Sequence, residues 1–212
     1  NERDWILAER TYSVWPDMEA QLRAHGIPQF TLDAHRPVGE FDVLGASFST
    51  ELCYTNLLNM IDLAGMALHA ADRGEDEPLV IAGGHAAFNP EPIADFIDVA
   101  VLGDGEEAAL LISDIIREWK ADGREGGREG LLMRLALTGA FYVPRFYDVD
   151  YLDDGRIQVV APNRPGVPHQ VTREEIFIVL GGAARVVLAE GSSTAAVGDA
   201  IVVPPETRFQ IE

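Results

Sequence analysis

The sequence predicts an α/β protein with an open, mostly parallel sheet, followed by a small all-β segment. Two apolar runs, at residues 79–84 and 99–105, each end in glycine, and a mostly polar stretch separates them. Parallel strands that are buried on both faces have such continuous apolar runs, and ligand-binding turns follow their carboxyl ends. From residue 146 onward the pattern changes to short apolar runs separated by turn residues, which is typical of antiparallel β structure.

Composition limits the class of protein. The chain has 212 residues and is 47% hydrophobic, which is enough for one large domain or two small ones. Its net charge of -19 disfavours nucleic acids and anionic membranes as partners, because both would be repelled. The one cysteine, Cys53, excludes an internal disulfide and a multi-cysteine metal site. Without a long apolar run or a signal-peptide pattern at Asn1, we expect a cytoplasmic piece of a longer protein.

The first elements are predicted to alternate between strand and helix. We expect a strand over residues 5–14 and a short strand over residues 29–32. A helix over residues 16–25 is predicted between them, because Pro16 suits a first helical turn and Gly26 ends a helix.

A buried strand and an amphipathic helix are predicted next. Residues 41–49 form the expected strand, and residues 52–64 form the expected helix. Apolar positions that share one helix face predict its buried side, which consists of Leu52, Leu57, Met60 and Leu63 or Ala64.

The rest of the chain is punctuated by glycine and proline. We expect an acidic loop at residues 72–78 and a helical turn at residues 92–96. A helix is expected at residues 108–120, a glycine- and charge-rich link at 123–130 and a last helix at 131–137. Residues 146–152 and 156–160 flank Asp153-Asp154-Gly155, which predicts a hairpin. A Pro/Gly linker follows at residues 163–168, and further strands are expected at residues 176–180, 184–189 and 200–203.

Several motifs occur in an order that resembles a known family. They include Trp15-Pro16-Asp17-Met18-Glu19, Ile81-Ala82-Gly83-Gly84, Phe88-Asn89-Pro90-Glu91-Pro92 and Gly103-Asp104-Gly105-Glu106-Glu107. With them, residues from about 5 to 168 resemble the N-terminal cobalamin-binding-like domain of a radical SAM protein family. The resemblance implies a doubly wound, flavodoxin-like sheet. The family's central first strand would precede Trp5 and is missing, which leaves a hole in the sheet or forces a re-paired sheet.

The same resemblance implies a cobalamin site at the carboxyl ends of the strands. The nucleotide tail of cobalamin would pass the backbone of Gly83 and Gly84, and Ser47 and Ser49 would form hydrogen bonds with it. The remaining expected lining residues are His85, Gly103 and Gly105. The alternative is that all these positions are strand-end turns without a ligand, with His85 an exposed turn residue.

The radical SAM core of the family would follow Pro168 and would supply three cysteines for an iron–sulfur cluster. This chain has only Cys53, so we expect no iron–sulfur cluster and no activity in the chain alone. The expected partner is the radical SAM core domain of the parent protein. For Cys53 itself, a buried structural thiol is the expected role.

From His169 onward the chain resembles part of a cupin barrel. Glu175, Gly182 and the pair Gly198-Asp199 match cupin motifs, whereas Val171 and Phe209 stand where metal-binding histidines would be. The resemblance implies at most two metal ligands, His169 and Glu175, so a divalent metal is not expected. Half of a barrel exposes sheet edges, which favours a homodimer through this segment.

Two other sets of residues resemble a cobalt-ligand motif or a catalytic acidic pair, but we interpret both as structural. Asp33-Ala34-His35 resembles the motif that supplies a cobalt ligand, but it follows the second expected strand and is interpreted as a loop. Glu106 and Glu107 open a helix, where acidic side chains complement the helix dipole.

We therefore expect a cobalamin-binding-like α/β domain at residues 1–144, a hairpin and linker at 145–168, and a partial cupin-like segment at 169–212. The first hypothesis for function is a non-catalytic module of a radical SAM protein that holds a cofactor or substrate. The alternatives are a cupin-type metal or small-molecule binding protein and a structural or dimerisation module.

Overall fold

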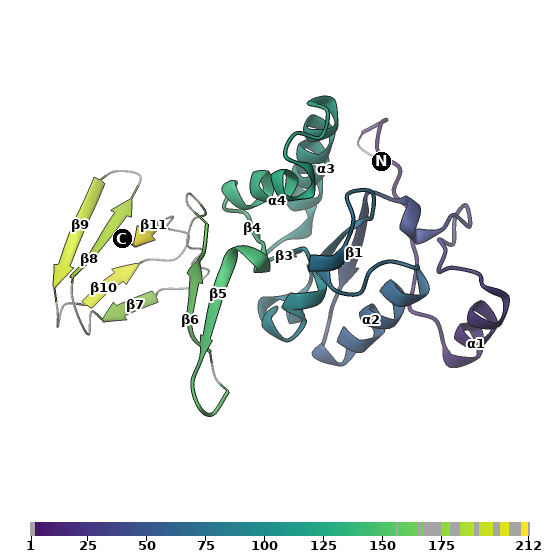
Figure 1. Ribbon diagram of the computed structural model, residues 1–212, viewed down its shortest axis with the longest axis horizontal. Coiled ribbons are helices and arrows are strands. Elements are labelled where there is room, and N and C mark those ends of the chain that lie inside the picture. Colours follow the sequence, from purple (N-terminus) through teal and green to yellow (C-terminus); the bar gives the residue numbers. More distant parts are fainter. Residues whose placement is uncertain are drawn as a thin grey trace. The chain divides into compact units, whose positions relative to one another are not determined.

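The computed structural model describes residues 3–155, 157–164, 167, 175–178, 183–188, 191–196, 200–203 and 209–211. The chain forms two compact units (Figure 1). Unit 1 consists of Asn1–Leu132 and Val143–Arg145, and unit 2 consists of Met133–Tyr142 and Phe146–Glu212.

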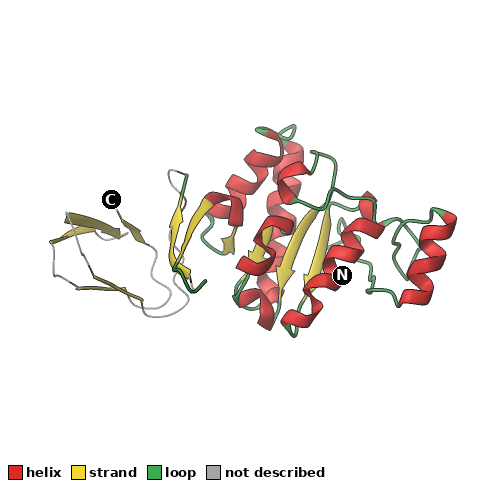
Figure 2. Cartoon of the chain, turned by 60° about the horizontal axis from the view of Figure 1, so that its bottom comes forward, coloured by secondary structure: helices red, strands yellow, loops and turns green. Residues whose placement is uncertain are grey.

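An open α/β sheet confirms the predicted fold class. Strands β1 (Val43–Ser47), β2 (Leu79–Gly83) and β3 (Val99–Val101) are parallel neighbours, and the four-stranded order is β1-β2-β3-β4, with β4 at Phe141–Tyr142. Every residue of β2 and β3 except Gly83 is buried, as expected for strands that are covered on both faces. The strands lie among the helices of the chain (Figure 2).

The α-helices of the described residues lie close to their predicted positions. They are α1 (Pro16–His25), α2 (Tyr54–Leu63), α3 (Gly105–Ala121) and α4 (Gly127–Leu137). Pro16 occupies the first turn of α1, and Gly26 ends this helix in the left-handed conformation, with φ at +62°. The predicted link at residues 123–130 is shorter than expected, because α4 already begins at Gly127.

The expectation that Leu52 lies on the buried side of a helix is wrong. Its side chain is 87% exposed. The hydroxyl of Thr50 accepts a hydrogen bond from the Leu52 N–H at 3.0 Å and opens a short 3-10 turn, η2 (Glu51–Cys53). Helix α2 therefore starts at Tyr54, and Leu57 and Leu63 supply its buried face as predicted.

The strand expected at residues 5–14 is also wrong, because no strand forms there. The Arg10 N–H donates to Asp33 Oδ2 at 3.0 Å, and the Thr31 hydroxyl donates to the Glu9 carboxylate. At Arg10 a side chain thus takes the place of a backbone acceptor, although the Arg10 carbonyl accepts the Leu32 N–H at 2.8 Å. The short strand predicted at residues 29–32 is reduced to one bridge between Phe30 and Pro37.

Five more short 3-10 turns complete the connections. They are η1 (Val38–Glu40), η3 (Ala70–Asp72), η4 (His85–Phe88), η5 (Glu91–Phe96) and η6 (Pro144–Phe146). The η5 turn matches the helical turn predicted between the two glycine-ended strands.

Unit 2 contains the predicted hairpin. Strands β5 (Tyr147–Tyr151) and β6 (Ile157–Pro162) are antiparallel, and Gly155 adopts φ +83° in the turn between them. Only glycine adopts this conformation without strain.

The C-terminal part of unit 2 is all β in its described residues. The strands are β7 (Glu175–Ile178), β8 (Ala183–Leu188), β9 (Gly191–Ala196), β10 (Ala200–Val203) and β11 (Phe209–Ile211). They form antiparallel sheets in the orders β10-β7 and β11-β8-β9. The sequence did not predict β9 or β11. No described helix is long and apolar enough to cross a membrane.

Candidate functional site

The carboxyl ends of the parallel strands bring the predicted site residues to one edge of the sheet. Ser47, the last residue of β1, is the register partner of Gly83, the last residue of β2. Ser49, Gly84 and His85 follow these strand ends directly and are exposed. Because β1, β2 and β3 are parallel, the turn after β3 lies at the same edge, and it contains the exposed residues Gly103 and Gly105. We call the seven residues Ser47, Ser49, Gly83, Gly84, His85, Gly103 and Gly105 the carboxyl edge.

Gly84 is required by a close approach of two backbone segments. It adopts φ +86°, and a Cβ added there would lie 2.5 Å from the carbonyl oxygen of Phe48. The Phe48 N–H donates to the Gly83 carbonyl at 2.8 Å, and the Ala86 N–H donates to the Phe48 carbonyl at 3.3 Å. Glycine at position 84 is therefore explained by packing of the chain against itself, with or without a ligand.

The other three glycines of the carboxyl edge have a different environment. A Cβ added to Gly83, Gly103 or Gly105 would meet no atom within 4 Å. The space beside these backbones is open. Gly103 has a φ of +150°, which by itself favours glycine, whereas neither packing nor a positive φ explains the lack of a side chain at Gly83 and Gly105. Open glycine backbone beside exposed serine hydroxyls suits a large ligand that passes close to the main chain.

Tyr54 contacts the segments that follow β1 and β2, next to the carboxyl edge, and sequence reasoning did not identify it. Its hydroxyl oxygen lies 2.8 Å from the carbonyl oxygen of Ala86 and 3.0 Å from that of Asn89. Its ring packs edge-to-face on Phe48 at a centroid distance of 5.3 Å. Burial, together with the nearby charge of Glu51, raises the pKa of Tyr54 above its usual value, so the hydroxyl keeps the proton that it donates.

Residues outside the edge have local structural roles. Asp33 accepts hydrogen bonds from Arg10, whose proximity lowers the pKa of Asp33, and the His35 ring packs against Phe30 at 5.7 Å. Glu106 and Glu107 are exposed in the first turn of α3, which is consistent with a dipole role.

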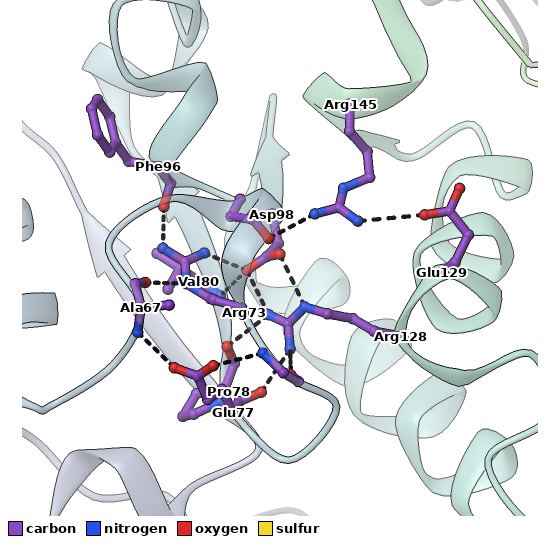
Figure 3. Close-up of polar contacts among 12 residues, drawn as sticks. Ala67, Arg73, Glu77, Pro78, Val80, Phe96, Asp98, Arg128, Glu129 and Arg145 are labelled. Carbon is purple, nitrogen blue, oxygen red and sulfur yellow. Dashed lines mark hydrogen bonds and ion pairs between the residues drawn. The ribbon is translucent and has the colours of Figure 1, made fainter.

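The opposite edge of the sheet holds a buried cluster of charges (Figure 3). Asp98 immediately precedes β3, and its carboxylate contacts Arg73 Nη1 at 2.7 Å and Arg128 Nη2 at 2.9 Å. The Asp98 side chain is 0% exposed, and the two arginine side chains are 0% and 8% exposed. Asp98 Oδ2 also accepts the Val80 N–H at 2.8 Å, which links the start of β3 to β2.

Backbone carbonyls accept most of the other hydrogen bonds of the two arginines. Arg73 donates to Ala67, Leu68 and Phe96, and Arg128 donates to Gly74, Glu77 and Pro78. Burial is the main cause of a lowered pKa at Arg73, and Asp98 opposes this shift. Because each guanidinium nitrogen has a protein partner and the side chains are buried, we interpret this cluster as a structural brace.

The predicted metal residues fall largely outside the described structure. His169 lies outside the described residues, and Glu175 begins β7 without a described side chain. Within the described part of the chain, no group of three or more His, Cys, Asp or Glu residues could hold a metal ion. Cys53 is a free, half-buried thiol at the start of α2.

An open, mostly parallel α/β sheet with glycine-rich turns at the carboxyl ends of its strands defines a flavodoxin-like class of domain. A comparison with protein families matches residues 1–144 to radical SAM proteins, N-terminal. The chain therefore belongs to this family. No curated protein and no solved structure matches the chain significantly.

Proposed function

We propose that the chain is a binding module of a radical SAM protein, with cobalamin held at the carboxyl edge. The family match supports a role within a radical SAM protein. The observation that carries the binding proposal is the open space beside Gly83, Gly103 and Gly105, next to the exposed residues Ser47 and Ser49. Parallel α/β sheets bind ligands in this position, outside the carboxyl ends of their strands.

The residues at this edge fit one part of cobalamin in particular. The nucleotide tail is long and narrow, so it can pass a glycine backbone that has no side chain beside it. The hydroxyls of Ser47 and Ser49 can donate hydrogen bonds to its phosphate oxygens. When bound, cobalamin would supply a corrin-held cobalt, and the module would present it to the catalytic domain of the radical SAM protein.

The proposal assigns no turnover to this chain. Its one cysteine, Cys53, cannot provide the three thiolates that the family uses for an iron–sulfur cluster. The module would therefore hold and position a cofactor or substrate for chemistry that another domain performs.

A titration with hydroxocobalamin, followed by visible absorbance, tests the proposal. A Cβ at position 83 meets no atom within 4 Å, so Gly83→Trp directs a large side chain into the open space and should abolish saturable binding. The matched control is Ala24→Trp, at an exposed position of α1. This position lies away from the carboxyl edge, because the adjacent residue Arg23 contacts Asp62 near the C-terminal end of α2. Equal binding by both variants, in samples with native circular dichroism, would refute the site.

A further inference from the structure

The η4 turn (His85–Phe88) follows β2 and places two ring side chains beside the carboxyl edge. A 3-10 helix has three residues per turn, so the side chains of its first and fourth residues lie on one face, about 6 Å apart along the axis. His85 and Phe88 hold these two positions. Both are exposed, Phe88 by 53%, whereas Ala86 and Ala87 between them are 4% and 0% exposed. The turn therefore buries its two alanines and presents its two rings to solvent.

Hydrogen bonds fix the backbone of this turn near both of its ends. The Phe48 carbonyl accepts the Ala86 N–H at 3.3 Å. The carbonyl oxygens of Ala86 and Asn89 lie 2.8 Å and 3.0 Å from the hydroxyl of Tyr54. The two rings thus project from a turn that is already ordered, so a ligand that contacts them pays little for ordering the main chain.

Neither ring has a polar or aromatic partner within the described part of the chain. His85 and Phe88 form no side-chain hydrogen bond, ion pair or ring contact with each other or with any other described residue. The exposed surface of Phe88 leaves water only when another molecule covers it. Aromatic rings attract one another in offset or edge-to-face contacts, with centroids about 4.5–7 Å apart. A planar ring that lies across this face can therefore contact both side chains.

The position of the turn indicates which part of the proposed ligand would meet these rings. Gly83 and Gly84 directly precede the turn, and a Cβ added to Gly83 would meet no atom within 4 Å. The nucleotide tail of cobalamin, which we propose to pass Gly83, ends in dimethylbenzimidazole, a planar aromatic base. The corrin, by contrast, is bordered by amide side chains. The base is therefore the part of the ligand that matches the two rings.

We propose that His85 and Phe88 form a stacking surface for the aromatic base at the end of the cobalamin tail. This inference rests on the proposed function and assigns a ligand chemistry to one part of the carboxyl edge. Stacking on an aromatic side chain requires only that the base is planar and has a π-face. A corrinoid with an aromatic base should therefore bind more tightly than one without it.

Two corrinoids separate this stacking surface from the rest of the site. Hydroxocobalamin has the base, whereas hydroxocobinamide phosphate keeps the corrin and the phosphate but lacks the ribose and the base. Each is titrated into the full chain and followed by visible absorbance. We expect Phe88→Ala to bind hydroxocobalamin roughly tenfold more weakly and hydroxocobinamide phosphate as the wild type does. His85→Ala should weaken hydroxocobalamin binding several-fold, and Phe88→Trp, which keeps an aromatic ring, should retain it.

The matched control is Leu52→Ala, in the turn that follows β1. Leu52 is 87% exposed, so its removal deletes exposed apolar surface without removing a ring, and both corrinoids should bind as to the wild type. Proton spectra of bound hydroxocobalamin give a direct readout. Protons of the base should shift upfield in the wild type, because the Phe88 ring shields them, and this shift should be lost in Phe88→Ala.

The outcomes distinguish the stacking surface from the cofactor site. If Phe88→Ala binds hydroxocobalamin as tightly as the wild type, or loses affinity for both corrinoids equally, the stacking surface is wrong and the proposed cofactor site stands. If the wild type binds neither corrinoid, the proposed function fails, and the stacking surface fails with it.

Discussion

At the scale of single residues, Asp98 joins two strands, helix α4 and the loop after η3 by one carboxylate. It forms ion pairs with Arg73 and Arg128, and both arginine side chains are nearly or completely buried. Buried charges of this kind contribute little net stability as a complete group, but loss of one member leaves the others without compensation. The brace fixes the amino ends of β2 and β3, and thereby the register on which the carboxyl edge depends.

Replacement of Asp98 by asparagine should therefore be severe. We expect Asp98→Asn to lower the free energy of unfolding by about 3–5 kcal/mol, because two buried guanidinium groups lose their counter-ion. Urea denaturation followed by circular dichroism measures this change. The matched control is Asp76→Asn, whose side chain is 90% exposed in its pair with Arg124 and should have no measurable effect. Similar midpoints for the two variants would mean that the brace is not structural.

The residue scale also shows where sequence reasoning stops. The double glycine at residues 83 and 84 identified the end of β2 correctly. However, the two glycines have different physical environments, which the sequence does not distinguish. Gly84 is fixed by a positive φ and by the Phe48 carbonyl, whereas Gly83 has open space beside it. Both facts depend on the position of β1, which local sequence does not contain. Arg73 and Asp98 were likewise hidden among surface-like charges in an acidic loop and a strand start.

At the scale of elements, Tyr54 ties the start of α2 to the η4 turn that follows β2. The Tyr54 hydroxyl lies within hydrogen-bond distance of the Ala86 and Asn89 carbonyl oxygens, and the Tyr54 ring packs on Phe48. Two segments next to the carboxyl edge, at Phe48 and in the η4 turn, thus contact one side chain of α2. The edge is therefore supported by the first turn of a helix, not only by the strand ends.

Removal of the Tyr54 hydroxyl should loosen this tie. We expect Tyr54→Phe to lower stability by about 1–2 kcal/mol at neutral pH, because two carbonyls lose their donor. The raised pKa of Tyr54 means that its contribution is complete below pH 10 and is lost as the pH rises through the folded-state value. The stability difference between wild type and variant should therefore shrink above pH 10. Tyr12→Phe, at a 62% exposed tyrosine, is the control, and an equal effect there would contradict the tie.

Periodicity and turn residues predicted most elements well. Helix α1 matches its predicted bounds because Pro16 and Gly26 fix both ends locally, and the hairpin follows from its Asp-Gly turn. The failures have a common cause, which is hydrogen bonds between side chains and backbone. The Asp33 carboxylate accepts the N–H of Arg10, within the expected strand, and Thr50 accepts the N–H of Leu52, so α2 starts after Leu52.

At the scale of the whole molecule, the chain combines an α/β unit with a second unit that is rich in antiparallel strands. The family match covers residues 1–144 and includes every residue of the carboxyl edge. The candidate binding site lies in unit 1.

The most direct test is the location of cobalamin on the intact chain. We would record amide spectra of the isotope-labelled protein during a titration with hydroxocobalamin. Binding at the carboxyl edge predicts saturable shifts at Ser47, Gly83 and Gly103, with the amides of Val80 and Asp98 at the opposite edge unchanged. An absence of shifts at saturating cofactor, or shifts confined to residues away from the carboxyl edge, would contradict the proposed site.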